Sequence, residues 1–145
     1  MQYRKARLDE VQEVAQVCAD AFEDYPYLSM IATNLKNPEQ YEEFVLALQE
    51  MLVRLAIKMD SCLVAEKHGR IVAAAILQHQ TISMLNYLQN GATKLFRFIS
   101  ITKLFKYFNF VEESERHLED SAEYDWYLMM LAVTPDYQRK GIGSR

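Results

Sequence analysis

The stretch WYLMMLAVTPDYQRKGIGSR, residues 126–145, decides how this chain is expected to fold. Its first part, residues 126–133, is apolar and carries no charge, which predicts a strand buried on both faces. Pro135 supplies no N–H to a sheet and fixes φ, so the strand is expected to end at the step Thr134-Pro135-Asp136. The stretch therefore predicts an apolar strand followed at once by a turn.

The turn after this strand contains two of the four glycines in the chain, Gly141 and Gly143. Glycine lacks Cβ, so successive backbone N–H groups can point into one concavity, and such a nest at the start of a helix binds pyrophosphate. The spacing differs from the Gly-x4-Gly-Lys-Ser/Thr loop of NTPases and from the Gly-x-Gly-x-x-Gly dinucleotide fingerprint. These two classes of nucleotide site are excluded, and a pyrophosphate-binding turn of another kind is predicted.

The segment resembles motif A of the GNAT superfamily of N-acetyltransferases, in which Gln/Arg-x-x-Gly-x-Gly/Ala follows a strand ending in Val-x-Pro. Gln138, Gly141 and Gly143 match the fixed positions, and Val-Thr-Pro at 133–135 matches the strand end. The opening Trp-Tyr-Leu at 126–128 resembles the branch that includes antibiotic-modifying and puromycin-type acetyltransferases. The alternative interpretation is an ordinary strand, turn and helix without a ligand.

The resemblance implies an α/β (α+β) fold with a mixed, mainly antiparallel sheet flanked by helices. Residues 1–145 would form the N-terminal part of one acyl-CoA N-acyltransferase domain. The chain ends two residues after Gly143, so the later helices and strands of the family would be absent. We therefore expect a truncated chain with little or no activity on its own, which dimerises or swaps elements across the uncovered edge of the strand at 126–133.

The resemblance also implies where acetyl-CoA binds, namely against the carboxyl end of that strand. Backbone groups of Leu131, Ala132 and Val133 would pair with the pantetheine arm as an added strand, and the Val133 N–H would polarise the thioester carbonyl. The pyrophosphate would be held by the following turn, formed by Gln138, Arg139, Lys140, Gly141, Ile142, Gly143 and Ser144. A charge-assisted hydrogen bond contributes about 1.5–3 kcal/mol and a helix dipole about 0.3–1 kcal/mol, so oriented amides should dominate.

The reaction implied is direct attack of a primary amine on the thioester, without an acyl-enzyme, because no cysteine lies near the motif. An amine of pKa near 10.4 needs about 4.6 kcal/mol to be presented neutral at pH 7, so a base is required. Glu123 and Asp125 are the nearest carboxylates, and ending an acidic connector is an equally good interpretation of both. By analogy of position, Tyr25 and Tyr27 would receive the acceptor in a loop after the first helix.

Composition limits the partners and the compartment. A net charge of −4 and a pI of 5.4 argue against nucleic acid and suit a cationic acceptor. Cys18 and Cys62 lie in apolar periodic segments, so we expect buried free thiols in a reducing cytoplasm. The spacing of the histidines predicts no metal site, and no secretory signal or membrane span is expected.

Two helices and a hairpin are predicted ahead of the strand at 126–133. A short strand at 3–6 precedes a helix that is capped by Asp9, with Gln12 completing a capping box, and that ends before Pro26. Asn37 as N-cap and Pro38 in the first turn predict a second helix that continues to Met59. Residues 61–66 and 70–78 are β-rich runs, and the Lys-His-Gly sequence between them is typical of an antiparallel hairpin.

A helical insertion is predicted at about 81–122. Within it, residues 94–110 interleave aromatic and basic side chains. They would either roof the acceptor cleft or lie on a membrane, or else form core-packed helices whose lysines reach solvent. An acidic run from Glu112 is interpreted as a solvated connector. The rival function is a non-catalytic remnant that binds CoA, or binds a partner through the aromatic segment.

Overall fold

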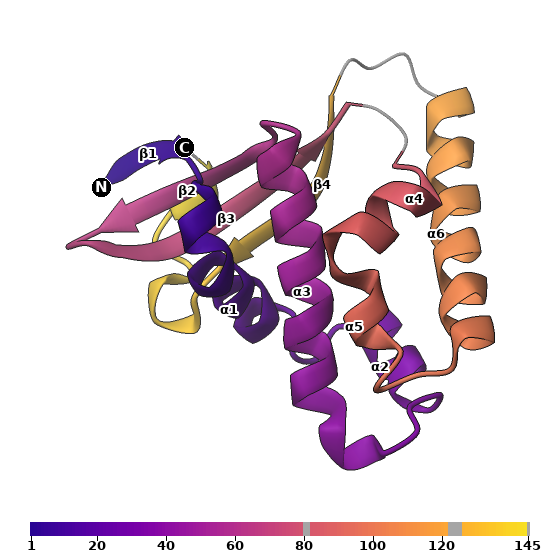
Figure 1. The fold of residues 1–145 in the computed structure, drawn as a ribbon. Helices are drawn as coiled ribbons and strands as arrows, with labels where there is room; N and C mark the ends of the chain where they lie inside the picture. The colour runs from indigo at the N-terminus through magenta and orange to yellow at the C-terminus, as the bar shows by residue number, and fades with distance from the viewer. Residues whose placement is uncertain (80–81, 122–125, 145) are drawn as a thin grey trace.

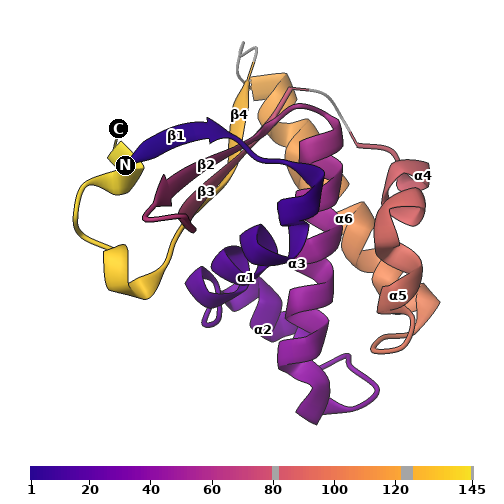
Figure 2. The same cartoon turned by 60° about the vertical axis from the view of Figure 1, so that its left-hand side comes forward.

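The computed structural model describes residues 1–79, 82–121 and 126–144. Its four-stranded sheet is antiparallel and has the order β1 (Gln2–Lys5), β2 (Cys62–Lys67), β3 (Arg70–Gln78), β4 (Tyr127–Val133). Helices α1 (Val11–Ala21) and α3 (Tyr41–Lys58) cover one face of the sheet (Figures 1 and 2). On the other side of α3 lie α4 (Met84–Tyr87), α5 (Thr93–Leu95) and α6 (Ile101–Ser121). The expected α+β architecture, an antiparallel sheet flanked by helices, is confirmed.

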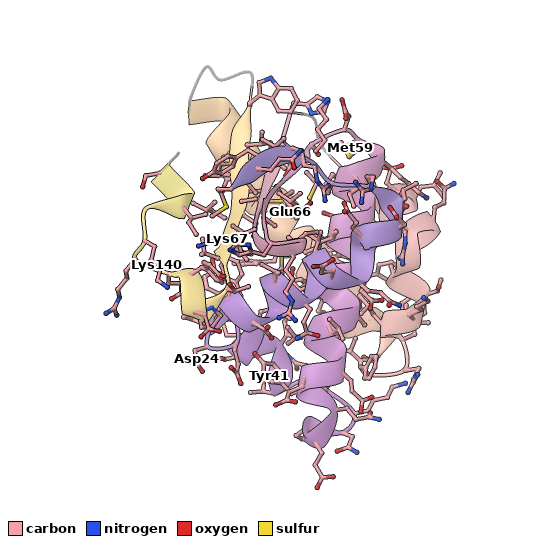
Figure 3. The ribbon with its side chains drawn as sticks, turned by 90° about the vertical axis from the view of Figure 1, so that its left-hand side faces the viewer. Asp24, Tyr41, Met59, Glu66, Lys67 and Lys140 are labelled. Carbon is pink, nitrogen blue, oxygen red and sulfur yellow. The ribbon has the colours of Figure 1, made fainter. Side chains whose placement is uncertain are left out.

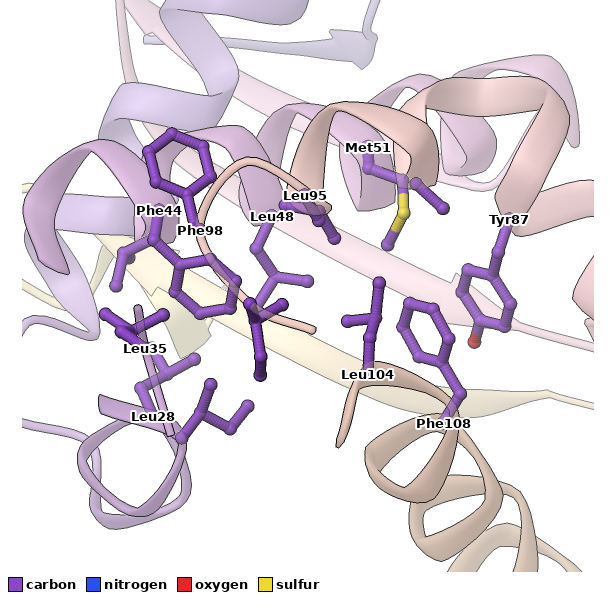
Figure 4. Packing of buried hydrophobic residues seen from close by; sticks show 14 of the residues in the cluster. Leu28, Leu35, Phe44, Leu48, Met51, Tyr87, Leu95, Phe98, Leu104 and Phe108 are labelled. Carbon is purple, nitrogen blue, oxygen red and sulfur yellow. The ribbon is translucent and has the colours of Figure 1, made fainter. Parts of the chain in front are cut away.

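Helix α3 lies between two hydrophobic clusters because it is apolar on opposite faces. Val53 and Ala56 pack toward the sheet together with residues of α1. Phe44 and Leu48 face the other way, into a cluster that includes α2 (Pro26–Ala32) and the helices after β3 (Figure 4). One long helix therefore joins the sheet layer to the outer helical layer.

The start of α1 differs from the prediction. A 3-10 turn at Leu8–Glu10 precedes the helix, and the Glu10 carboxylate accepts a hydrogen bond from the Arg7 N–H at 2.8 Å. Glu10 is also buried against Arg4, with an Arg4 Nη2 to Glu10 Oε1 distance of 2.6 Å. Asp9 is therefore not the cap of α1. Glu10 holds the N-cap position, and its carboxylate bonds Arg7 and Arg4 and no amide of α1.

The predicted boundaries around the second helix are confirmed in part. Asn37 accepts a hydrogen bond from the Glu39 N–H, and Pro38 opens a 3-10 turn at Pro38–Gln40 that leads into α3. Helix α1 ends before Pro26 as expected, but Pro26 begins α2 and does not lie in a loop. Proline at a first helical position loses no internal hydrogen bond, which explains the extra helix.

The hairpin between β2 and β3 is confirmed. Lys67 pairs with Arg70, so the turn consists of two residues, His68 and Gly69. Their φ values are 52° and 74°, the left-handed conformation that two-residue hairpin turns need. This turn fixes the pairing register of β2 with β3. The register in turn places the C-terminal end of β2 beside the last residues of the chain.

The prediction that β4 is buried on both faces is wrong. Ala132 is fully buried, whereas Leu128 and Leu131 are 49% and 42% exposed. Helices cover the α1 side of the sheet, while the opposite side holds a small cluster of buried residues formed by Ala65, Val72, Ala73 and Ile142. The apolar run in β4 therefore lines an open sheet face as well as the core.

The region after β3 is helical, and its core-packed interpretation is confirmed for several side chains. Leu95, Phe98, Leu104 and Phe108 are buried in the cluster of Figure 4, whereas the four basic residues of the segment are exposed: Lys94, Arg97, Lys103, Lys106. The acidic run from 112 continues α6 to Ser121, so its described part is a helix and not a connector. No helix in the described part of the chain is long and apolar enough to cross a membrane.

Candidate functional site

Strand β4 forms an edge of the sheet, and its hydrogen-bond register decides which of its peptide groups are available. The Thr134 N–H donates to the Val72 carbonyl at 2.9 Å, and Ala132 pairs with Ala74 two residues further along. Peptide groups alternate in direction along an antiparallel strand. The N–H and C=O of Ala132 therefore face β3, while those of Leu131 and Val133 face the open edge.

One of these edge groups is already bound. The Gln138 side chain donates from Nε2 to the Val133 carbonyl oxygen at 3.0 Å, which ties the turn to the end of β4. The Leu131 N–H, the Leu131 C=O and the Val133 N–H then remain directed to the edge. These groups match an extended ligand that carries amides.

The turn that follows contains two residues with left-handed backbone. Arg139 and Gly141 have φ values of 61° and 74°, on either side of Lys140. A Cβ built on Gly141 would meet nothing within 4 Å, so the space beside Gly141 is open. Left-handed residues in such a turn direct successive N–H groups to one side, where they attract negative charge.

Gly143 is needed for a different reason. A Cβ at Gly143 would lie 3.2 Å from Leu131 Cδ2, which is tighter than ordinary contact. The short 3-10 turn Ile142–Ser144 can therefore lie close to β4, with Ile142 buried against the sheet. The Ser144 hydroxyl donates to the Gly141 carbonyl at 3.4 Å and closes this turn.

The surroundings of the turn are basic although the whole chain is acidic. Arg139 and Lys140 are exposed in the turn, and Lys67 at the end of β2 contacts Tyr137 (Figure 3). Residues that are far apart in the sequence therefore give this end of the sheet a local positive charge. The sequence pattern identified the turn. It gave no indication that Lys67 lies beside the turn, because that position depends on the pairing of β2 with β3.

The other predicted site residues lie elsewhere. Tyr25 immediately precedes α2, with its ring 5.4 Å from that of Phe22, and Tyr27 is part of α2, so neither lies in an extended loop. Glu123 and Asp125 fall outside the described residues, and their role stays a prediction. Cys18 and Cys62 are buried free thiols as expected, and burial raises the pKa of each to about 12.

Sequence reasoning missed an acidic hollow between α1 and α3. It has a volume of about 340 Å³, and its polar lining includes Gln16, Asp20, Glu23, Tyr41, Glu42 and Glu43. The Tyr41 hydroxyl donates to the Glu23 carbonyl at 3.3 Å and joins the two helices at the rim. The acidic residues come from separate helix ends, so no continuous pattern in the sequence marks them.

The turn and the strand before it fall within a match to a known family. The sequence matches the Acetyltransferase (GNAT) family over residues 20–145. The chain therefore belongs to the GNAT acetyltransferase family, whose members generally use acetyl-CoA. A search of curated proteins gives no match.

Two solved structures are similar in fold. One, described as an acetyltransferase, has a TM-score of 0.47 and 16% identity, and the match covers 99% of this chain and 69% of that chain. The other is Drosophila melanogaster polyamine N-acetyltransferase, described as an enzyme that forms N-acetylagmatine. It has a TM-score of 0.51 and 19% identity, with 99% of this chain and 65% of that chain covered. The chain thus spans about two thirds of the length of each.

Proposed function

We propose that the chain provides the acetyl-CoA site of an N-acetyltransferase that transfers an acetyl group to a primary amine by direct attack. This proposal rests on one observation, namely that two structural features directly adjoin each other along the chain. The open edge of β4 leads through the Gln138 to Val133 hydrogen bond straight into the left-handed turn around Gly141. An amide-bearing arm and a pyrophosphate are the neighbouring parts of acetyl-CoA that these two features suit.

The donor fits the groups that are present. The edge offers the N–H and C=O of Leu131 and the N–H of Val133, which suit the amides of pantetheine. The turn at 139–143, whose residues other than Ile142 are exposed, suits the pyrophosphate, since oriented N–H groups bind phosphate oxygens without needing a side chain. Acetyl-CoA supplies a thioester, which is an activated acyl group.

The chemistry requires the amine nitrogen to form a bond with the thioester carbonyl carbon while the C–S bond breaks. CoA leaves as a thiolate, the proton of the amine passes to a base, and the thiolate becomes the thiol by taking a proton from that base or from water. The Val133 N–H at the open edge is the proposed donor to the carbonyl oxygen, where a positioned hydrogen bond stabilises developing negative charge. Burial of Cys18 and Cys62 as neutral thiols supports a route without an acyl-cysteine.

The proposed base remains Glu123 or Asp125, as the sequence suggests. A positioned base contributes about a hundredfold to ten-thousandfold to the rate. The acceptor is proposed to be a cationic amine, supported by the net charge of −4 and by the acidic side chains around the hollow between α1 and α3. Proposed contacts of Tyr25 and Tyr27 with the acceptor rest on analogy of position alone.

Calorimetric titration with acetyl-CoA, followed by an acetyl-transfer assay with a panel of primary amines, tests the proposal. Binding and turnover with at least one amine are expected of the whole protein that contains this chain. Binding without turnover on any amine would favour the rival function, a non-catalytic CoA-binding remnant. Absence of binding would contradict the assignment of β4 and the turn.

A further inference from the structure

Two lysines from distant parts of the sequence meet over one aromatic ring beside the turn. Lys67 Nζ lies 5.2 Å from the centroid of the Tyr137 ring, and Lys140 Nζ lies 5.1 Å from the same centroid. Lys67 belongs to the end of β2, whereas Lys140 lies in the turn between Arg139 and Gly141. Figure 3 shows both lysines on the same side of the molecule.

The Tyr137 ring is a shared contact of these two ammonium groups. Both lie within about 5 Å of its ring centroid, so they are no more than about 10 Å apart. The ring is half-buried and packs against the cluster on the open sheet face that contains Ile142. A ring fixed in this way attracts a cation to its face, which limits the freedom of both side chains.

The two lysines carry positive charge that no ion pair among the described residues neutralises. In the part of the chain that the structure describes, neither Lys67 nor Lys140 forms an ion pair. The neighbouring carboxylate Glu66 is bound by Arg4 at 2.6 Å, and among the described residues Asp136 in the adjacent turn forms no ion pair with either lysine. Like charges held together without a counter-charge repel each other, and a bound anion relieves that repulsion.

We propose that Lys67 and Lys140, positioned by Tyr137, bind a phosphate monoester dianion, namely the 3′-phosphate on the ribose of CoA. This inference rests on the proposed function. CoA carries this phosphate in addition to its pyrophosphate, and two ammonium groups match its two negative charges. Lys140 belongs to the proposed pyrophosphate turn, so a ligand held by the turn lies next to the lysine pair. The pair thus selects CoA over its dephosphorylated form.

The test compares CoA with 3′-dephospho-CoA in calorimetric titrations of the whole protein. The wild type is expected to prefer CoA by about five- to tenfold at low salt, with a smaller preference at high salt. Lys67→Gln should remove most of this preference by weakening the binding of CoA while leaving that of 3′-dephospho-CoA unchanged. Lys58→Gln, which changes an exposed lysine at the end of α3, serves as the matched control and should preserve the preference.

Further arms identify the source of the phosphate and the role of the ring. Adenosine 3′,5′-bisphosphate should bind more tightly than 5′-AMP, and Lys67→Gln should abolish that difference, whereas inorganic phosphate should compete only weakly. Strong competition by inorganic phosphate would overturn the assignment to CoA. Tyr137→Phe should keep the preference and Tyr137→Leu should reduce it, since the ring positions the lysines.

The proposal is overturned if the wild type does not distinguish CoA from 3′-dephospho-CoA, or if Lys67→Gln weakens both equally. In either case the proposed function would still be supported, because the protein would bind both ligands. If the wild type binds neither ligand, the proposed function and this inference fail together. Thermal unfolding of each variant shows whether a lost preference reflects lost structure.

Discussion

Gly141 and Gly143 are needed for different physical reasons although one motif contains both. Gly141 has a φ of 74° and open space where a side chain would lie, so its backbone conformation and an unobstructed approach are what matter. Gly143 has close contact with Leu131, so its small size is what matters. Substitutions at the two positions should therefore fail in different ways.

Gly141→Asp is expected to abolish acetyl-CoA binding because it places a carboxylate in the nest. Gly141→Asn has the same size without the charge, and Asn tolerates the left-handed conformation better than most residues, so it should bind more weakly than the wild type but measurably. Calorimetric titration measures both variants. Equal affinities for the Asp and Asn variants would contradict an anion site at this turn.

Glu10 is expected to make stability depend on pH. Hydrogen bonding from the Arg4 guanidinium holds the pKa of the buried carboxyl below its ordinary value of 4.5. A lowered folded pKa means that the stabilisation is fully present above the unfolded pKa and is lost as pH falls through the folded one. At pH 7, Glu10→Gln should therefore lower the free energy of unfolding by about 1.5–3 kcal/mol, the range for a charge-assisted hydrogen bond.

Urea unfolding at a series of pH values measures this effect. The difference between wild type and Glu10→Gln should shrink as the pH falls from 4.5 through the lowered folded pKa of Glu10, because below that pKa both proteins carry a neutral side chain. Asp9→Asn is the matched control. Asp9 is exposed, and its Oδ1 forms a surface ion pair with Arg7 Nε at 3.5 Å, so this substitution should change the free energy of unfolding by less than about 1 kcal/mol. A difference that stays constant with pH would show that the carboxylate charge is not responsible.

At the scale of elements, α6 is held in place by its buried side chains, which pack in the hydrophobic cluster beside α3. The interleaving of aromatic and basic residues along the helix is not what holds it. Leu104 is 1% exposed in the cluster beside α3, whereas Ile101 in the first turn of the same helix is 51% exposed. Leu104→Ala should lower the free energy of unfolding by about 2–5 kcal/mol, and Ile101→Ala should change it by less than about 0.5 kcal/mol. Chemical denaturation compares the two, and equal small effects would show that α6 is a loosely attached surface helix.

The alternation of peptide groups along β4 can be tested by hydrogen exchange. The amide hydrogen of Ala132 should exchange slowly with or without ligand, because it is bound to β3. Those of Leu131 and Val133 should exchange quickly in the ligand-free monomer, at concentrations too low for association, and slowly with acetyl-CoA, because the ligand would cover the open edge. Unchanged exchange at Leu131 and Val133 when acetyl-CoA is bound would exclude the added-strand arrangement.

For the whole molecule, the open edge of β4 has a consequence for association. An apolar strand with unpaired peptide groups is prone to pair with another chain, and β4 has no charged residue between Tyr127 and Val133. We expect the chain to dimerise through this edge and acetyl-CoA to reverse the association, since both use the peptide groups of Leu131 and Val133. Light scattering with and without acetyl-CoA measures the mass of the particle.

A variant that cannot bind the ligand gives the control for this experiment. Gly141→Asp should dimerise as the wild type does and remain dimeric when acetyl-CoA is added. A wild-type dimer that persists at saturating acetyl-CoA would place the association on another surface. A monomer in the absence of ligand would show that the edge is too short or too strongly twisted to pair.

The sequence by itself determined the features that depend on neighbouring residues. His68-Gly69 specifies a two-residue turn, Asn37-Pro38 specifies a helix start, and the spacing of Gln138, Gly141 and Gly143 indicates the family. Each result follows from backbone chemistry within a few residues, such as a missing Cβ or a missing N–H. Such constraints act locally, so a linear reading detects them.

The tertiary structure alone decided the features that depend on contacts between separate parts of the chain. Hydrophobicity identifies β4 as a strand but not which of its faces is covered, since that depends on where α1, α3 and Ile142 pack. The register with β3 determines that Leu131 and Val133, and not Ala132, present their peptide groups. Similarly, Glu10 becomes a buried partner of Arg4, six positions away, because the 3-10 turn after β1 brings the two side chains together. Lys67 meets Lys140 over Tyr137 because the sheet brings together residues dozens of positions apart. The free energy of these contacts depends on distance in space, which the order of residues does not specify.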